Sequence, residues 1–146
     1  MKKFELTTDT KMFLGRKLFR IKALISFGNV KVGDMGGYIE KEENLSQYGN
    51  AWVSGNAEVY GNAKVYGDAE VSGNADYATA SGFGSEYRTT TFFKLKNSDE
   101  IGVRCGCFYG TLKEFKEKVK ETHGESKKAK EYLMLADLME YRFSEE

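Results

Sequence analysis

Few residues in this chain of 146 could take part in chemistry. His123 is the single histidine, and Cys105 and Cys107 are the two cysteines, separated by one glycine. A metal site usually requires four Cys or His ligands, and these residues supply at most three. The chain also lacks a phosphate-binding Gly-Lys-Ser/Thr loop, a nucleophile elbow and a paired-carboxylate motif. We therefore expect no catalytic residue set, no metal site and no cofactor.

The two cysteines and the histidine have simple structural interpretations. Cys105 and Cys107 would serve as small buried hydrophobic residues in a reducing cytosol. His123 falls at the end of a predicted helix, where contact with the helix dipole is the favoured role. The alternative is that His123 acts as the general base of a small acyltransferase. We keep that alternative as the enzymatic possibility.

Binding is the chemistry that the remaining residues favour. Arg88 precedes three threonines, and its guanidinium together with the hydroxyls of Thr89 and Thr90 would suit a phosphate or carboxylate. A strand-surface arginine with no ligand is the alternative. Trp52, Tyr60 and Tyr66 are expected to be exposed aromatic residues, which anchor partners or stack on bases. Burial of the tyrosines in a subunit interface is the alternative here. His123 completes the set of candidate binding residues.

The element that must position these residues is a repeat. Residues 49–78 contain five hexads of the type Gly-Asn-Ala-x-Val-x, in which the fifth position is Val53, Val59, Val65, Val71 or Tyr77. Alanine and valine two residues apart point to the same side of a strand, so both sets should face inward. The Gly-Asn or Gly-Asp pair suits a corner, because these residues tolerate positive φ.

The hexads resemble the left-handed parallel β-helix of hexapeptide-repeat proteins, in which three hexads form one coil of about 18 residues. The resemblance implies a mainly β fold: a short left-handed parallel β-helix over 43–80, with about two coils. Residues 18 apart would then be neighbours, which places Tyr48 beside Tyr66 and Trp52 beside Glu70. So few coils need covering at both ends. We therefore expect a homo-oligomer, with a trimer favoured.

The flanking segments would cover these ends. Residues 1–42 are predicted to form an N-terminal β cap, with a hairpin turn at residues 14–16. A small-residue linker at 81–85 leads to a C-terminal ββαα module over 85–146, with a hairpin of strands 87–96 and 101–108. A capping box beginning at Thr111 predicts a first helix that ends near Gly124. An apolar stripe predicts a second helix from about Ser126 to Phe143.

The segment from Gly33 to Ser46 with its hexads looks like small bacterial and prophage hexapeptide-repeat proteins. The segments 88–93, 104–111 and 122–124 look like a module found on phage-borne repeat proteins. These resemblances imply a non-catalytic binding protein, a phage-encoded inhibitor of a bacterial defence system. It would occlude a host defence protein or sequester a nucleotide signal. Besides the acyltransferase, a structural assembly module is the alternative.

The composition limits the partners and the compartment. Twenty-two basic and 22 acidic residues cancel, so no net charge favours a nucleic acid polymer or an anionic membrane. The N-terminus lacks the apolar core of a signal peptide, and no apolar run approaches the length of a membrane span. We therefore expect a cytoplasmic protein of the bacterial host.

Overall fold

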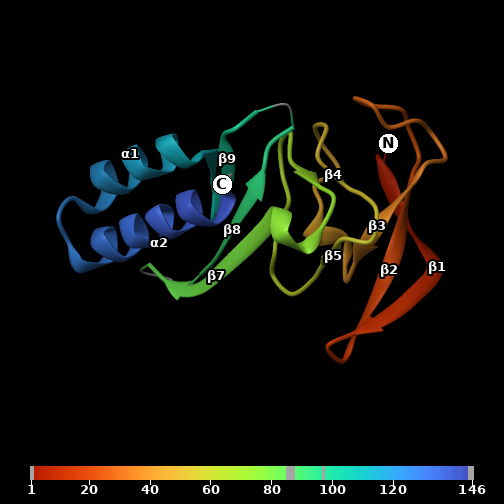
Figure 1. Cartoon of the computed structure of the whole chain (residues 1–146), viewed down its shortest axis with the longest axis horizontal. Helices are drawn as coiled ribbons and strands as arrows, with labels where there is room; N and C mark the ends of the chain where they lie inside the picture. The colour runs from red at the N-terminus through yellow and green to blue at the C-terminus, as the bar shows by residue number, and fades with distance from the viewer. Residues whose placement is uncertain (1, 85–87, 97, 145–146) are drawn as a thin grey trace.

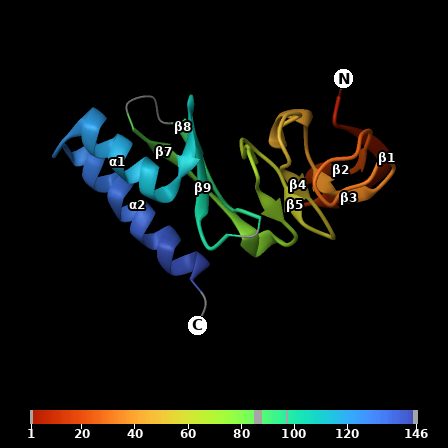
Figure 2. The same cartoon turned by 90° about the horizontal axis from the view of Figure 1, so that it is seen from above.

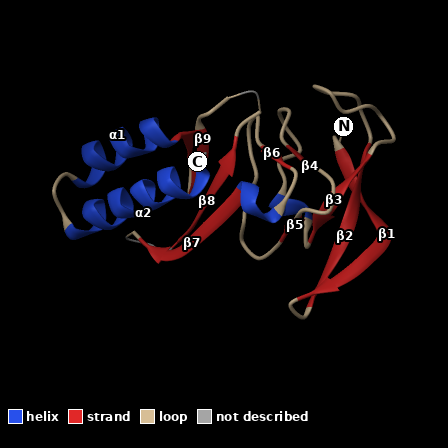
Figure 3. Ribbon diagram, viewed as in Figure 1, coloured by secondary structure: helices blue, strands red, loops and turns tan. Residues whose placement is uncertain are grey.

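The computed structural model of the chain describes residues 2–84, 88–96 and 98–144. An N-terminal β-hairpin, the hexad segment, and a C-terminal sheet with two helices follow one another along the long axis (Figure 1; Figure 3). The strands are β1 (Phe4–Phe13), β2 (Arg16–Ala23), β3 (Met35–Ile39), β4 (Trp52–Val53), β5 (Glu58–Val59), β6 (Glu70–Val71), β7 (Tyr77–Phe83), β8 (Arg88–Lys94), β9 (Ile101–Cys105) and β10 (Phe108–Thr111). The helices are the short 3-10 helices η1 (Glu42–Asn44) and η2 (Asn74–Asp76), and α1 (Leu112–His123) and α2 (Lys127–Phe143).

The first sheet grows from the N-terminal hairpin of β1 and β2. Leu14 and Gly15 form its turn, with φ of 51° and 75°. Two successive positive φ angles are typical of the type I′ turn, whose twist matches that of the strands. β3 pairs antiparallel with β2 and parallel with β5, so the sheet order is β1-β2-β3-β5. The predicted turn is confirmed, and the hairpin continues into a sheet that contains a hexad strand.

The alternate apolar positions of the first four hexads are buried, as the pattern predicts, whereas Ala75 of the fifth hexad lies in η2 and is exposed. No more than 2% of the surface is exposed for any of Ala51, Ala57, Ala63, Ala69, Val53, Val59, Val65 and Val71. The outward positions differ from expectation, because Trp52 and Glu58 are only 8% exposed. Phe27 packs edge-on against the Trp52 ring at 5.3 Å, and Lys11 of β1 forms an ion pair with Glu58 at 2.8 Å. The N-terminal segment thus covers part of the face that was expected to meet solvent.

The predicted left-handed parallel β-helix is wrong. Trp52–Val53 pairs parallel with Glu70–Val71 at the predicted spacing of 18 residues, but Tyr38–Ile39 pairs with Glu58–Val59 at a spacing of 20. The two pairs also belong to different sheets, and most pairing among the described strands is antiparallel. Unequal spacings do not build a regular solenoid. Over residues 2–84, 88–96 and 98–144 the fold is mixed α/β, with two four-stranded sheets, a two-stranded parallel sheet and two C-terminal helices.

The second sheet contains more strands than the sequence predicts. β7 to β10 form an antiparallel sheet of order β10-β9-β8-β7. β8 and β9 correspond to the predicted hairpin, of which Tyr87 and Asn97 lie outside the described residues. The predicted ββαα arrangement is therefore incomplete, because the structure adds two strands, β7 and β10, to the sheet. β7 begins at Tyr77 in the last hexad and occupies part of the segment that was predicted to be a linker. β7 belongs to this sheet because its residues 77–83 pair with β8.

Both C-terminal helices form where the sequence predicts them. The Thr111 hydroxyl accepts a hydrogen bond from the Glu114 amide (3.2 Å), and the Glu114 carboxylate accepts one from the Thr111 amide (2.8 Å). This is the expected capping box. Ser126 caps α2 in a similar way by accepting from the Ala129 amide. Within the part of the chain that the structure describes, no helix is long and apolar enough to cross a membrane.

β8 is shared between two hydrophobic cores. Phe92 and Phe93 are neighbours in the strand, so they point to opposite faces of the sheet. Phe92 packs in the core beneath α1 and α2, whereas Phe93 packs with the hexad core. Both side chains are fully buried. Figure 2 shows the sheet of β7, β8 and β9 between the helices on one side and the hexads on the other.

Several contacts among the described residues join the hexads to the second sheet. The Lys64 amide donates to the Thr91 hydroxyl (3.0 Å), and the Lys96 amide donates to the Asp68 carbonyl (2.9 Å). The ring of Tyr109 lies directly against Gly67, where a Cβ would be 1.7 Å from its hydroxyl oxygen. These contacts hold the hexads against the face of the sheet that carries Phe93 and Arg104.

Candidate ligand-binding site

Two hollows meet at Arg88, the first residue of β8. The first, which we call the basic groove, has a volume of about 500 Å³ and is lined by Lys41, Glu43, Asn62, Ala63, Lys64, Arg88, Thr89, Arg104 and Gly106. The second, the aromatic pocket, has a volume of about 310 Å³ and is lined by Phe83, Arg88, Cys105, Phe108, Phe115, Lys118, Val119, Thr122, His123 and Tyr132. Arg88 belongs to both linings.

The basic groove lies between the hexads and the second sheet. Lys41 and Lys64 come from the hexad side, and Arg88 and Arg104 come from β8 and β9. Among the described residues of the lining, four side chains are basic and Glu43 is the single carboxylate. Among the described residues, no ion pair neutralises Lys64 or Arg104. The groove is therefore a local positive site on a chain of zero net charge.

Arg104 is held in place by an aromatic ring. Its guanidinium lies 4.3 Å from the centroid of the Tyr66 ring, within the range of a cation–π contact. Its Nε is buried, and of the described residues none offers that atom a hydrogen-bond partner. A buried donor without an acceptor is costly to stability.

A shallower hollow continues the groove along the hexads. Glu43 and Lys64 line both, and the extension adds Tyr48 and Tyr66. Tyr48 is 84% exposed. The predicted proximity of Tyr48 and Tyr66 is thus confirmed, and it places an exposed ring at the end of the groove.

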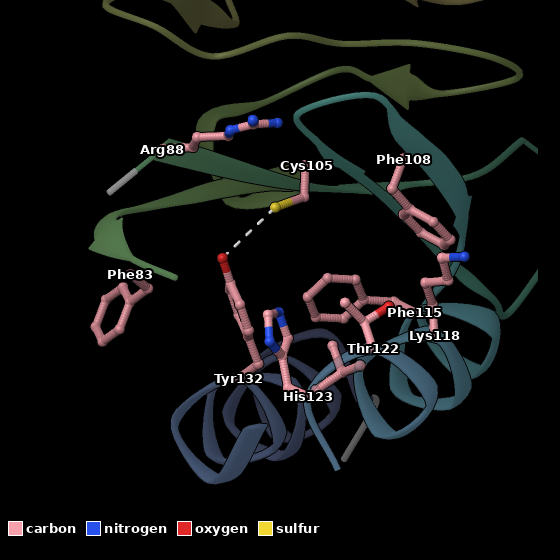
Figure 4. A pocket seen from close by; sticks show the side chains of 10 residues that line it. Phe83, Arg88, Cys105, Phe108, Phe115, Lys118, Thr122, His123 and Tyr132 are labelled. Atoms are coloured by element: carbon pink, nitrogen blue, oxygen red, sulfur yellow. Dashed lines mark hydrogen bonds between the residues drawn. The ribbon is translucent and has the colours of Figure 1, made fainter. Parts of the chain in front are cut away.

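The aromatic pocket opens between the second sheet and the two helices (Figure 4). Phe115 of α1 occupies the centre of its wall, tilted against Phe108 at 5.7 Å and edge-on to Tyr132 at 5.4 Å between ring centroids. The ring of His123 stacks beside Tyr132 at 6.2 Å. Arg88, Lys118 and His123 add basic groups to this apolar wall. Phe115 and Tyr132 are only 3% and 6% exposed, so these rings belong mainly to the core beneath the helices and offer little surface to a ligand.

Cys105 faces the interior of this pocket. The Thr90 hydroxyl donates to Cys105 Sγ (3.2 Å), and the Tyr132 hydroxyl lies 3.8 Å from the same sulfur. Burial, reinforced by the neighbouring Cys105, raises the pKa of Tyr132 to about 12, so this phenol is protonated at neutral pH. Within the described residues no hydrogen bond joins His123 to the thiol. The predicted burial is wrong for Cys107, which is exposed in the β9–β10 turn, whereas Cys105 is half-buried.

The structure brings some of the predicted binding residues together and separates others. Arg88 and Thr89 line the basic groove, Arg88 and His123 line the aromatic pocket, and Tyr66 supports Arg104. Thr90 is fully buried behind the pocket, where it contacts the thiol. Tyr60 lies against the N-terminal hairpin, 5.6 Å from Phe13.

Trp52 requires a correction. Its predicted exposure is wrong, because the ring is buried with Phe27 against it. Trp52 is thus part of the hexad core and does not present a surface for a partner.

Sequence reasoning missed several residues of the site. Lys41, Lys64 and Arg104 lie far apart along the chain, and each by itself resembles an ordinary solvated charge. The one available signal was Lys64, a basic side chain at the outward position of its hexad. Phe108 and Phe115 form the wall of a pocket only because β10 and α1 fold over β9.

A scan of this sequence against models of known protein families finds no match, and a search of curated proteins finds no similar sequence.

Proposed function

We propose that this protein is a non-catalytic binding protein that sequesters a small phosphate-bearing molecule in the basic groove. The observation that carries the proposal is the lining of the groove, in which the described residues place four basic side chains and one carboxylate around about 500 Å³. Lys64 and Arg104 lack an ion-pair partner among the described residues.

Phosphate is the anion that suits this lining best. A guanidinium presents paired donors to two phosphate oxygens, and lysine adds a mobile point charge. Lys41 and Lys64 lie on the hexad side and the two arginines on the sheet side, so a phosphate chain between them would meet cations from both walls. The Thr89 hydroxyl supplies a neutral donor or acceptor at the same edge.

This proposal favours one of the two mechanisms expected from the sequence. A phage-encoded inhibitor of a bacterial defence system could occlude a host protein or sequester a nucleotide signal. A concave basic groove supports sequestration of a small anion, whereas occlusion of a protein depends on a broad exposed surface. The acyltransferase alternative receives less support, because His123 packs its ring beside Tyr132.

The test is titration calorimetry of the whole protein with inorganic pyrophosphate, ADP, ADP-ribose and a cyclic dinucleotide at low salt. We expect at least one of them to bind. Arg104→Gln and Lys64→Gln should each weaken binding by about tenfold or more, because hydrogen bonds to charged groups contribute about 1.5 to 3 kcal/mol. Lys128→Gln, an exposed lysine on α2 outside both hollows, is the matched control and should bind like the wild type.

Failure of all four ligands to bind would contradict the proposal. Occlusion of a host protein would then be the favoured mechanism. Equal weakening by Lys128→Gln and Lys64→Gln would also contradict it, since the effect would then reflect net charge alone.

A further inference from the structure

Helix α2 carries apolar residues on two opposite faces. Its inner face packs in the core beneath the helices through four buried residues, Ala129, Tyr132, Ala136 and Met139. Its outer face carries Met134, Leu138 and Tyr141, whose side chains are 69%, 54% and 78% exposed. A surface helix normally has one apolar face and one polar face. The outer face of α2 therefore differs from that of an ordinary surface helix.

The three exposed residues form one stripe, which we call the α2 stripe. Met134, Leu138 and Tyr141 are spaced i, i+4 and i+7, so they follow one another along about two turns of the helix. Of the described large hydrophobic residues that are exposed, no other lies on α1 or α2. Single exposed hydrophobic residues are normal, whereas a contiguous group of them marks an interaction surface. We therefore interpret the stripe as a place where a partner docks.

The stripe is separate from the proposed phosphate site. None of its residues lines the basic groove or the aromatic pocket. The two helices lie at one end of the molecule, and the second sheet lies between them and the hexads (Figure 1; Figure 2). A partner on the α2 stripe would thus leave the basic groove open.

The charges beside the stripe indicate which partner covers it. One edge carries Lys130 and Asp137, and the other edge carries Glu131 and Arg142, so each edge has one positive and one negative charge. When two copies of a helix pack antiparallel, each edge meets the same edge of the other copy. Lys130 would then lie near Asp137 of the second copy. Glu131 would lie near Arg142 of the second copy in the same way.

Asp137 keeps its outward direction although it has a neighbour in its own chain. Its carboxylate lies 3.4 Å from Lys116 Nζ, but the side chain is 75% exposed. Among the described residues no ion pair joins Glu131 or Arg142 to another side chain. Both edges can therefore form ion pairs with a second copy of the helix.

We infer that the α2 stripe is the interface of a homodimer, in which two α2 helices pack antiparallel about a two-fold axis near Leu135. With the axis there, Met134 and Leu138 interleave with the same residues of the second copy, and Tyr141 covers each end. The charged partners are then offset by about 4.5 Å along the helix axis, which long side chains span. This dimer does not depend on the proposed function. The trimer expected from the sequence depended on the hexads, whereas one straight stripe favours a two-fold pair.

Sedimentation velocity of the whole protein tests the dimer. From low to high micromolar concentration, we expect the sedimentation coefficient to rise from that of a monomer to that of a dimer. Leu138→Glu should weaken self-association by about a hundredfold or more, because each copy would bury an unpaired carboxylate in the interface. Met12→Glu is the matched control, since Met12 is 66% exposed on β1, and it should associate like the wild type. Far-UV circular dichroism checks that both variants are folded.

A charge exchange tests the antiparallel orientation. Arg142→Glu should weaken association by about tenfold, because two copies of the pair change from attraction to repulsion. Adding Glu131→Arg to that variant restores opposite charges across the interface and should recover most of the lost affinity. The two residues are 11 positions apart on one helix, so they cannot pair within a chain.

Three results would overturn the inference. The first is a protein that remains monomeric at high micromolar concentration. The second is an oligomer, of any size, that Leu138→Glu leaves unchanged, because its interface would lie elsewhere. The third is a double exchange at positions 131 and 142 that recovers no affinity, which would exclude the antiparallel pair. Leu138→Glu should bind pyrophosphate as the wild type does, so failure of the dimer and failure of the phosphate site are distinguishable.

Discussion

At the scale of single residues, Lys3 is the most unusual ionisable group. Its side chain is 1% exposed, and Nζ donates to the Ala51 carbonyl at 2.7 Å and to the Gly49 carbonyl at 3.4 Å. The ammonium also lies 4.9 Å from the centroid of the Phe27 ring. Burial lowers the pKa of Lys3 from 10.5 to about 8. Lys3 thus ties the N-terminal strand to the first hexad with a charge that is costly to bury.

This lowered pKa predicts that stability rises with pH. Between pH 8 and 10.5 the unfolded chain holds more protons at Lys3 than the folded chain does, so the free energy of unfolding increases as pH rises. We expect an increase of about 2 kcal/mol between pH 7.5 and 9.5, from 1.36 kcal/mol for each pKa unit. Urea unfolding at several pH values measures it. The window ends below pH 10, where tyrosines with raised pKa values, such as Tyr132, begin to favour unfolding.

Lys3→Met provides the control for this effect. Methionine keeps the aliphatic length and removes the titrating group, so the increase with pH should disappear. A Lys3→Met variant that retains the full increase would show that another group causes it.

At the scale of elements, two glycines at equivalent corners have different surroundings. Gly61 and Gly67 have almost the same φ, 66° and 64°. A Cβ at Gly61 would meet no atom within 4 Å, whereas a Cβ at Gly67 would collide with the ring of Tyr109. A side chain at position 61 would therefore strain only the backbone. A side chain at position 67 would also disturb the contact between the hexads and the second sheet.

Alanine at the two corners should therefore have unequal effects. Gly61→Ala should lower the free energy of unfolding by about 1 kcal/mol, the cost of a left-handed residue that carries a Cβ. Gly67→Ala should cost about 1 to 3 kcal/mol more, because overpacking forces Tyr109 away. Chemical denaturation of both variants measures the difference.

The double variant Gly67→Ala with Tyr109→Ala tests the cause. Without the ring, the alanine at position 67 should cost no more than it does at position 61. Strict additivity of the two substitutions would contradict a direct contact between these residues.

At the scale of the whole molecule, the shared strand β8 couples the two cores. Phe93 belongs to the hexad core and Phe92 to the core beneath the helices, and both are fully buried. The division of the chain into units at 43–80 and 85–146 remains a prediction. β7 crosses that boundary, because it begins at Tyr77 and pairs with β8.

We expect the molecule to unfold in one cooperative transition. Phe92→Ala and Phe93→Ala should each lower the free energy of unfolding by about 3 to 5 kcal/mol, the usual cost of truncating a buried phenylalanine. Each should shift the whole transition, monitored by far-UV circular dichroism for the helices and by Trp52 fluorescence for the hexads. Two separate transitions, with each substitution affecting only one of them, would show that the cores fold independently.

Sequence reasoning was most accurate where structure is decided locally. The capping box at Thr111, the turn at Leu14–Gly15 and the inward alternation of alanine and valine depend on neighbouring residues. The first two are confirmed, and the alternation is confirmed for the first four hexads but not for Ala75. The pairing of Trp52 with Glu70 also follows from the repeat length. These features are fixed by hydrogen bonds and side-chain directions within a few residues, so the rest of the chain changes them little.

Pairing between distant strands and the assembly of the site were decided by the tertiary structure. The hexad pattern determines which side chains point inward, but the 20-residue spacing from Tyr38 to Glu58 and the antiparallel strands on either side prevent a regular β-helix. Arg88 and His123 were recognisable from the sequence as residues able to bind. Only the packing of the hexads and helices on opposite faces of one sheet brings Arg88 between a basic groove and an aromatic pocket, because contacts across such distances leave no local pattern.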